Sequence, residues 1–132
     1  MFKAENDFDI AHRAMGRSEN EPPITDAVCF HSQQCAEKYL KAVLQEEEQP
    51  IPRIHGLIAL LEACIVLDVE LETLREDLEG LEGYAVAVRY PGANPSAEFA
   101  ERALKAATRV RSFIRAKLGL DHPPETQETE SK

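Results

Sequence analysis

The stretch that decides the fold is residues 30–42, FHSQQCAEKYLKA, inside a longer amphipathic run that starts near Thr25 and stops at Pro50. Its apolar residues recur at spacings of three and four, which is the periodicity of one face of an α-helix. These residues are Val28, Cys35, Tyr39 and Ala42, widened by Phe30, Leu40, Val43 and Leu44. Thr25 or Asp26 is suited to cap the start of this helix.

Four further helices are predicted around this one. The apolar periodicity indicates helices over residues 6–17, 57–67 and 70–88. A fifth is predicted to begin with Asn94 as cap and Pro95 as its first residue, and to close at Leu118 and Gly119. Gly80 and Gly83 suggest a bend or a close helix approach in the fourth. No alternating apolar pattern favours a strand, so the predicted fold class is all-α.

Length and charge narrow the class of protein. The chain has 132 residues and a formal net charge of −9. We therefore expect one domain over 1–118, followed by a flexible acidic tail over 119–132. The acidic balance opposes non-specific nucleic-acid binding. No apolar run approaches the ~20 residues that span a membrane, and the N-terminus lacks a secretory pattern. A cytoplasmic protein without membrane contact is expected.

The charges are unevenly distributed along the chain. Residues 62–82 are strongly acidic, whereas residues 102–117 carry six Lys and Arg and no acid. Two helices charged in this way attract each other when they pack side by side. The three cysteines, Cys29, Cys35 and Cys64, are predicted to be reduced and mostly buried.

The motifs of metal, nucleophile and phosphate-loop chemistry are missing from the sequence. Asp9 and His12 are three residues apart, but a helical di-metal site needs a second such pair. Cys35 lies on an apolar stripe, where a thiol is inert. There is no glycine loop for a phosphate. We therefore predict no metal, no cofactor and no catalytic residue from these patterns.

Polar residues in three segments remain as candidates. His31, Gln34, Lys38 and Lys41 share one helix face. A solvated face is the expectation for Lys41, whereas the part with His31, Gln34 and Lys38 is either solvated or partly covered, for example by a second subunit. His55 precedes Gly56, where it either caps the third helix or joins a site. Arg89 and Tyr90 end the fourth helix; a cation there suits the helix dipole, and an Arg beside Tyr rings also suits a phosphate and a stacked base.

The order of these motifs resembles a HEPN domain (higher eukaryotes and prokaryotes nucleotide-binding) over about residues 6–118. The matching features are residues 30–38, then Pro52-x-x-His55-Gly56-Leu57, then Tyr84-x-x-x-x-Arg89-Tyr90-Pro91, and a closing amphipathic helix. The resemblance implies an up-and-down antiparallel bundle that commonly forms a homodimer. It also implies genomic pairing with a minimal nucleotidyltransferase, often as a toxin–antitoxin couple.

One departure from the family pattern bears on activity. Many HEPN proteins are metal-independent ribonucleases with an Arg followed four to six residues later by His, but Arg89 is followed by YPGANP. We therefore favour a non-catalytic protein that binds a nucleotide, RNA or a nucleotidyltransferase at a cleft lined by Arg89, Tyr90, His55, Lys38 and His31. Two alternatives are a divergent ribonuclease using Arg89 with His55, and a purely structural interaction module. Tyr84 or Tyr90 is a candidate for modification by the partner.

Overall fold

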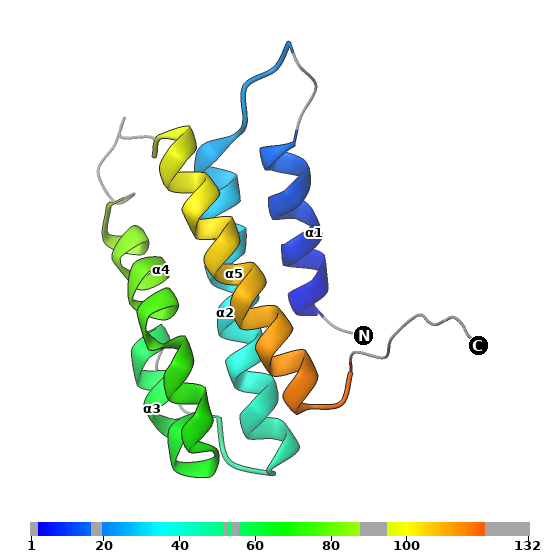
Figure 1. Cartoon of the computed structure of the whole chain (residues 1–132), viewed down its shortest axis with the longest axis vertical. Helices are drawn as coiled ribbons and strands as arrows, with labels where there is room; N and C mark the ends of the chain where they lie inside the picture. Colours follow the sequence, from blue (N-terminus) through cyan, green and yellow to red (C-terminus); the bar gives the residue numbers. More distant parts are fainter. Residues whose placement is uncertain (1–2, 17–19, 52, 54–55, 88–94, 121–132) are drawn as a thin grey trace, which may run out of the picture.

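The computed structural model describes residues 3–16, 20–51, 53, 56–87 and 95–120, with the backbone alone for residues 84–87. Within this part of the chain every regular element is helical (Figure 1). The elements are α1 (Lys3–Met15), α2 (Thr25–Glu46), α3 (Leu57–Leu67), the short 3₁₀ helix η1 (Val69–Leu74), α4 (Arg75–Ala87) and α5 (Ala97–Lys117). The prediction of an all-α fold with five α-helices is confirmed.

Helices α2 and α5 lie in the middle of the bundle, with α1 on one side and α3 and α4 on the other (Figure 1). Consecutive helices alternate in direction, except that α2 and α3 run the same way. Glu47, just after α2, and Leu67, at the end of α3, line the same cavity of about 280 Å³, so both helices finish at one end of the bundle. The connector after α2 carries the chain back before α3 starts.

The core is built from the predicted apolar stripes. Alanines dominate where α1 meets α2, and leucines fill the space between α2, α3 and α4. The largest side chains that are fully buried are Tyr39, Leu40, Leu44, Leu57, Leu60, Leu61, Leu71, Leu78, Leu81 and Ile114. Phe30 was predicted to widen the α2 stripe, but it is 56% exposed. It lies two residues from Val28, and at about 100° per residue this places it on the opposite side of the helix.

Three predicted helix starts are wrong. Helix α1 begins at Lys3 rather than near residue 6, and it ends at Met15. Helix α2 follows Ile24 without a side-chain cap, because Thr25 and Asp26 already lie inside the helix. Helix α5 is capped by Ser96, whose Oγ accepts the Phe99 N–H at 3.0 Å, so it begins two residues later than predicted. Both Ser and Asn are preferred residues at a helix N-cap. Ser96 is the cap because it stands three residues before Phe99, whose backbone N–H it accepts.

The fourth predicted helix is two elements. Val69–Leu74 forms η1, and the α-helical part starts only at Arg75. Asp68 caps the start of η1, because its Oδ1 accepts the Glu70 N–H at 3.0 Å. At the same end of the bundle, Gly119 after α5 has φ +70°, the left-handed conformation that was predicted for it.

Candidate functional site

Asp7 of α1 lies at the centre of the first polar cluster, which we name the Asp7 cluster: Asp7, His31 and Lys38. The Asp7 side chain is 8% exposed. Its Oδ1 is 2.7 Å from His31 Nδ1, and its Oδ2 accepts a hydrogen bond from Lys38 Nζ at 2.5 Å. An ionised carboxylate only accepts hydrogen bonds, so the ring proton lies on Nδ1. The part of the α2 face with His31 and Lys38 is thus partly covered, by α1 of the same chain.

Glu5, about half a turn before Asp7 on α1, organises the second group, the Glu5 cluster: Glu5, Tyr39, Arg111 and Arg115. Arg111 binds both Glu5 carboxylate oxygens, with Nε and Nη2 each at 2.8 Å. The Tyr39 hydroxyl donates to the same carboxylate, and Arg115 Nη1 lies 3.3 Å from that hydroxyl. The cluster therefore ties α1 to both α2 and α5.

The ionisation of these groups fits a structural role. The bonds from Arg111 lower the pKa of Glu5, so the carboxylate stays charged. Burial, followed by the hydrogen bond to Glu5, raises the pKa of Tyr39 to about 12. Burial also raises the pKa of Cys35 to about 12, helped by the nearby charges of Glu5 and Asp7. Neither the phenol nor the thiol is a nucleophile near neutral pH.

A third polar contact joins α3 to α4. Ile58, in the first turn of α3, donates its N–H to Glu82 Oε1 at 3.2 Å. A Cβ on Gly56 would lie 3.1 Å from the same oxygen, a close contact that a small shift of the Glu82 side chain would have to relieve. Gly56 itself is the N-cap residue of α3, and no side chain of its own caps the helix. Glu82 was not predicted as a functional residue, because in the sequence it resembles one more acid on a solvated helix.

The five predicted site residues are therefore only partly placed. His31 and Lys38 converge on Asp7. His55, Arg89 and Tyr90 lie outside the described residues, as does the side chain of Tyr84. The convergence of all five on one cleft stays a prediction. Asp7 and Glu5 were missed because no local pattern on α1 distinguishes an acid that faces α2 from one that faces water.

A groove separates α4 from α5. Its first part is a cavity of about 370 Å³, lined by Glu76, Asp77, Gly80, Leu81, Phe99, Arg102, Ala103, Ala106 and Arg109. Its second part, of about 490 Å³, is lined by Thr73, Leu74, Asp77, Thr108, Arg109, Ser112 and Phe113. Asp77 and Arg109 line both parts and are joined across the groove, with Arg109 Nη2 donating to Asp77 Oδ1 at 2.6 Å. We call the two parts together the α4–α5 groove.

The basic helix α5 is largely neutralised by its neighbours, as the opposite charges of the two segments predicted. Arg109 pairs with Asp77, Arg111 with Glu5, and Lys117 with Asp68 at 3.1 Å. Arg102 differs from them. It lies 5.6 Å from the centre of the Phe99 ring, and no carboxylate in the described part of the chain pairs with it.

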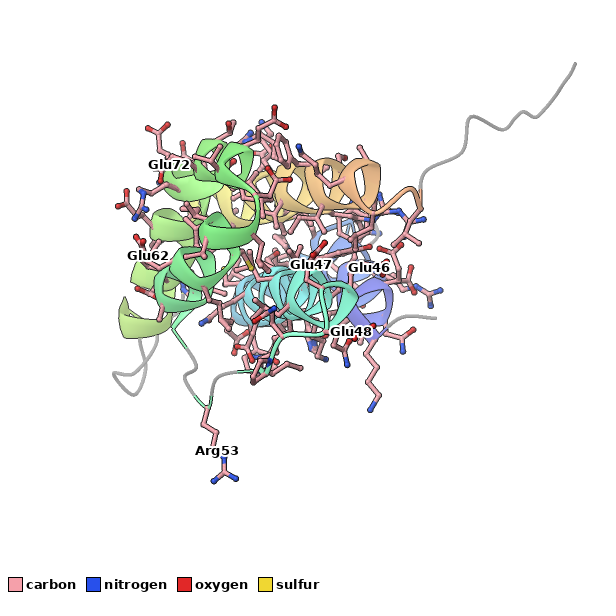
Figure 2. The ribbon with its side chains drawn as sticks, turned by 90° about the horizontal axis from the view of Figure 1, so that it is seen from below. Glu46, Glu47, Glu48, Arg53, Glu62 and Glu72 are labelled. Atoms are coloured by element: carbon pink, nitrogen blue, oxygen red, sulfur yellow. The ribbon has the colours of Figure 1, made fainter. Side chains whose placement is uncertain are left out.

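Acidic side chains gather at the end of the bundle where α2 stops (Figure 2). Glu46, Glu47 and Glu48 are exposed at the C-terminal end of α2, and none of them has an ion pair among the described residues. Negative charge at a helix C-terminus is unfavourable, because the helix dipole is negative there. Glu62 and Glu72 also point outward in this view, and Arg75 bridges them. We call the three residues Glu46, Glu47 and Glu48 the acidic end of the bundle.

A family model described as the HEPN domain matches residues 1–117. The chain belongs to the HEPN family. No curated protein and no solved structure matches it. The family assignment agrees with the motif order seen in the sequence and with the helical architecture.

Two searches of this HEPN chain gave negative findings for the described residues. No group of three or more His, Cys, Asp or Glu side chains among them is arranged to hold a metal ion. In the same part of the chain, none of the helices combines the length and the apolar character needed to cross a membrane.

Proposed function

We propose that this HEPN protein is a non-catalytic binding component that pairs with a minimal nucleotidyltransferase in a toxin–antitoxin-like system. The observation that carries this proposal is the distribution of charge. The cations of α5 are largely used within the fold, whereas Glu46, Glu47 and Glu48 stay exposed and form no ion pair with any residue that the structure describes. A surface of this kind repels a polyphosphate backbone and attracts a protein with a basic face.

A local phosphate site is compatible with this overall charge. Arg89 and Tyr90 follow α4, and His55 precedes Gly56. The contact of Glu82 with Gly56 and Ile58 supports a shared site for these residues. It joins the start of α3 to α4 at a point five residues before α4 ends at Ala87. We propose that Arg89 neutralises the phosphate of a nucleotide or a short RNA segment, while Tyr90 stacks on the base.

Two features favour binding over cleavage. The family's ribonucleases place a His four to six residues after the Arg, and the sequence after Arg89 has none in that window. His31 has its Nδ1 engaged by Asp7. Without a His at that spacing, the general base for the 2′-hydroxyl of RNA would have to come from elsewhere in the chain, as His55 does in the ribonuclease alternative.

The partner proposal is tested by copurification. The chain is co-expressed with a nucleotidyltransferase encoded by a neighbouring gene, and we expect a complex that weakens as salt is raised. The variant Glu46→Lys/Glu47→Lys should lower its affinity, whereas Glu101→Lys, an exposed acid on α5, should not. Absence of a complex at low salt, or equal behaviour of the two variants, overturns the proposed surface.

The phosphate site is tested by titrating nucleotides and short RNA into the wild type and Arg89→Ala. We expect binding to be lost in Arg89→Ala and kept in Arg53→Ala, which removes an exposed arginine from the connector. RNA should stay intact throughout. Cleavage by the wild type that disappears in both Arg89→Ala and His55→Ala contradicts the non-catalytic proposal and supports the ribonuclease alternative.

A further inference from the structure

Helices α1 and α3 lie on opposite sides of the bundle (Figure 1), and the sides that they turn away from the core differ in composition. The exposed residues of α1 are polar or charged, with the exception of Ile10. On α3 the buried residues share one side of the helix. The residues on its other side, at about 100° per residue, are Ile58, Ala59, Glu62, Ala63, Ile65 and Val66. We call them the α3 outer face, and Glu62 is the one polar residue among them.

The α3 outer face leaves apolar surface in contact with water. Val66 is 84% exposed, and Val69, at the start of η1, is 71% exposed. These are the two highest values for large hydrophobic residues in the described part of the chain. Ile58, Ala63 and Ile65 are only partly buried against the core. A helix that is apolar on nearly all sides is normally covered on all sides, so α3 has the composition of a helix that a further element packs against.

The shape of this face suits a second helix. Ile58, Glu62 and Val66 follow one another at a spacing of four, so their side chains form a ridge. The row beside it contains Ala59 and Ala63, whose short side chains leave a shallow groove. Helices pack by placing the ridge of one in the groove of the other. The 11 residues of α3 provide a straight contact of about 16 Å at 1.5 Å per residue, which is about three turns.

The charge around this face determines the sign of its occupant. Residues 57–74 contain no Lys, Arg or His, and their acids are Glu62, Asp68, Glu70 and Glu72. Two cations from other segments, Arg75 and Lys117, pair with these four acids, so negative charge stays in excess. The acidic end adds to this excess at the same end of the bundle (Figure 2). A second copy of the chain would bring the same acids to the contact and RNA would bring phosphates, whereas a basic partner is attracted.

We propose that the α3 outer face, continued by Val69, is a docking surface for a basic amphipathic helix of another protein. The apolar side of that helix covers Val66 and Val69, and its Lys and Arg residues face the surrounding acids. This inference goes beyond the proposed function, because it concerns α3 rather than the acidic end. It holds for a partner of any activity, and its test needs no nucleotidyltransferase.

A synthetic peptide of about 18 residues is the probe, with leucines at spacings of three and four and lysines at the other positions. A second peptide has the same composition, with its leucines spread around all sides of the helix. We expect the first peptide to bind the protein with a dissociation constant at least about tenfold lower than the second. Its binding should shift the backbone amide NMR signals of α3 and η1 more than those of α1.

Two double variants locate the contact. Val66→Gln/Val69→Gln removes the apolar centre of the proposed surface, and Ile10→Gln/Ile24→Gln removes two exposed apolar side chains near α1. Since all four positions are exposed, both variants should fold, which circular dichroism checks. We expect the first variant to raise the dissociation constant of the amphipathic peptide at least about tenfold, and the second to leave it unchanged.

Several outcomes overturn the proposal. They are the absence of saturable binding at low salt, equal binding of the two peptides, and an equal response of the two variants. Sedimentation of the protein without peptide tests a second copy as the occupant. A wild-type dimer that dissociates in Val66→Gln/Val69→Gln, but not in Ile10→Gln/Ile24→Gln, also overturns the proposal, because the face then binds another copy of this chain.

Discussion

The contact of α1 with the rest of the bundle differs from the α4–α5 groove in how many of its charged side chains are paired within the chain. On the α1 side, Asp7 and Glu5 are covered by the cations of α2 and α5, so polar groups hold the fold together. In the groove, Asp77 and Arg109 pair in the same way, yet Glu76 and Arg102 stay apart on opposite walls. Charges that are satisfied within the chain stabilise it, and those that are not are available to a partner. Substitutions on each side separate these two roles.

The largest effect is expected for Asp7→Ala. The substitution leaves His31 and Lys38 beside each other without the carboxylate that both bind. Breaking a buried pair costs about 3 to 5 kcal/mol. Lys38 keeps 35% of its side chain exposed and can turn toward water, so we expect a loss of about 2 to 3 kcal/mol in the free energy of unfolding, measured by urea titration.

Asp9→Ala is the matched control for this change. It removes the same side chain from the same helix, but Asp9 is 58% exposed and pairs only with Arg13 one turn away. A pair of this kind contributes about 0.5 kcal/mol or less. If the two variants unfold at the same urea concentration, the Asp7 cluster does not stabilise the fold.

Glu5→Gln should have the next largest effect, and one that depends on pH. Its carboxylate takes two bonds from Arg111, so we expect a loss of about 1 kcal/mol at pH 7. The pKa of Glu5 is lowered in the folded state from the ordinary 4.5. The stabilisation is therefore complete above pH 4.5 and disappears as the pH falls through the lower, folded-state value. Unfolding of both proteins over an acid pH series measures it, and a gap that is independent of pH contradicts it.

The positions of the helices along the chain were predictable, because the residues that become buried recur in the sequence at the spacing of one α-helix face. Apolar residues at spacings of three and four predicted the bounds of α3, Leu57 to Leu67, and α2 ends at Glu46, four residues before the predicted stop at Pro50. The starts of α2 and α5 were less predictable, since several residues of suitable type stand close together and tertiary contacts select one. Ile24, for example, is fixed because its N–H donates to the Ala14 carbonyl at 3.0 Å.

The polar clusters were half predictable. The sequence named both His31 and Lys38, but left open whether their part of the α2 face is solvated or partly covered. It did not name Asp7, because the partner lies 24 residues before His31 and nothing local specifies that α1 packs there. Glu82 was missed for the same reason, since its role depends on a helix start that is far away in the sequence. Periodicity reveals which side of a helix is buried, but not which side chain faces it.

Arg109→Ala should have a smaller effect on unfolding than the changes on the α1 side. Arg109 makes a bidentate bond with Asp77, but 60% of its side chain is exposed to solvent. We expect a loss of about 0.5 to 1 kcal/mol that shrinks as salt is added. Lys105→Ala, which removes an exposed pair with Glu101 at 3.7 Å, should cost almost nothing. Urea titrations at low protein concentration measure both, and equal losses would show that the bidentate geometry adds no stability.

The smallest effect is expected for Ser32→Ala, and it has the opposite sign. Ser32 is fully buried on α2, and no hydrogen-bond partner of its hydroxyl is found in the described part of the chain. An unsatisfied buried hydroxyl costs about 1 to 3 kcal/mol, although its removal also loses some packing. Ser112→Ala gives the exposed control, because both changes gain the same helix propensity. We expect Ser32→Ala to be the more stable of the two by about 0.5 kcal/mol in thermal or urea unfolding. A destabilised Ser32→Ala would show instead that the hydroxyl is bonded, which would make Ser32 part of the polar structure of α2 rather than an isolated defect beside it.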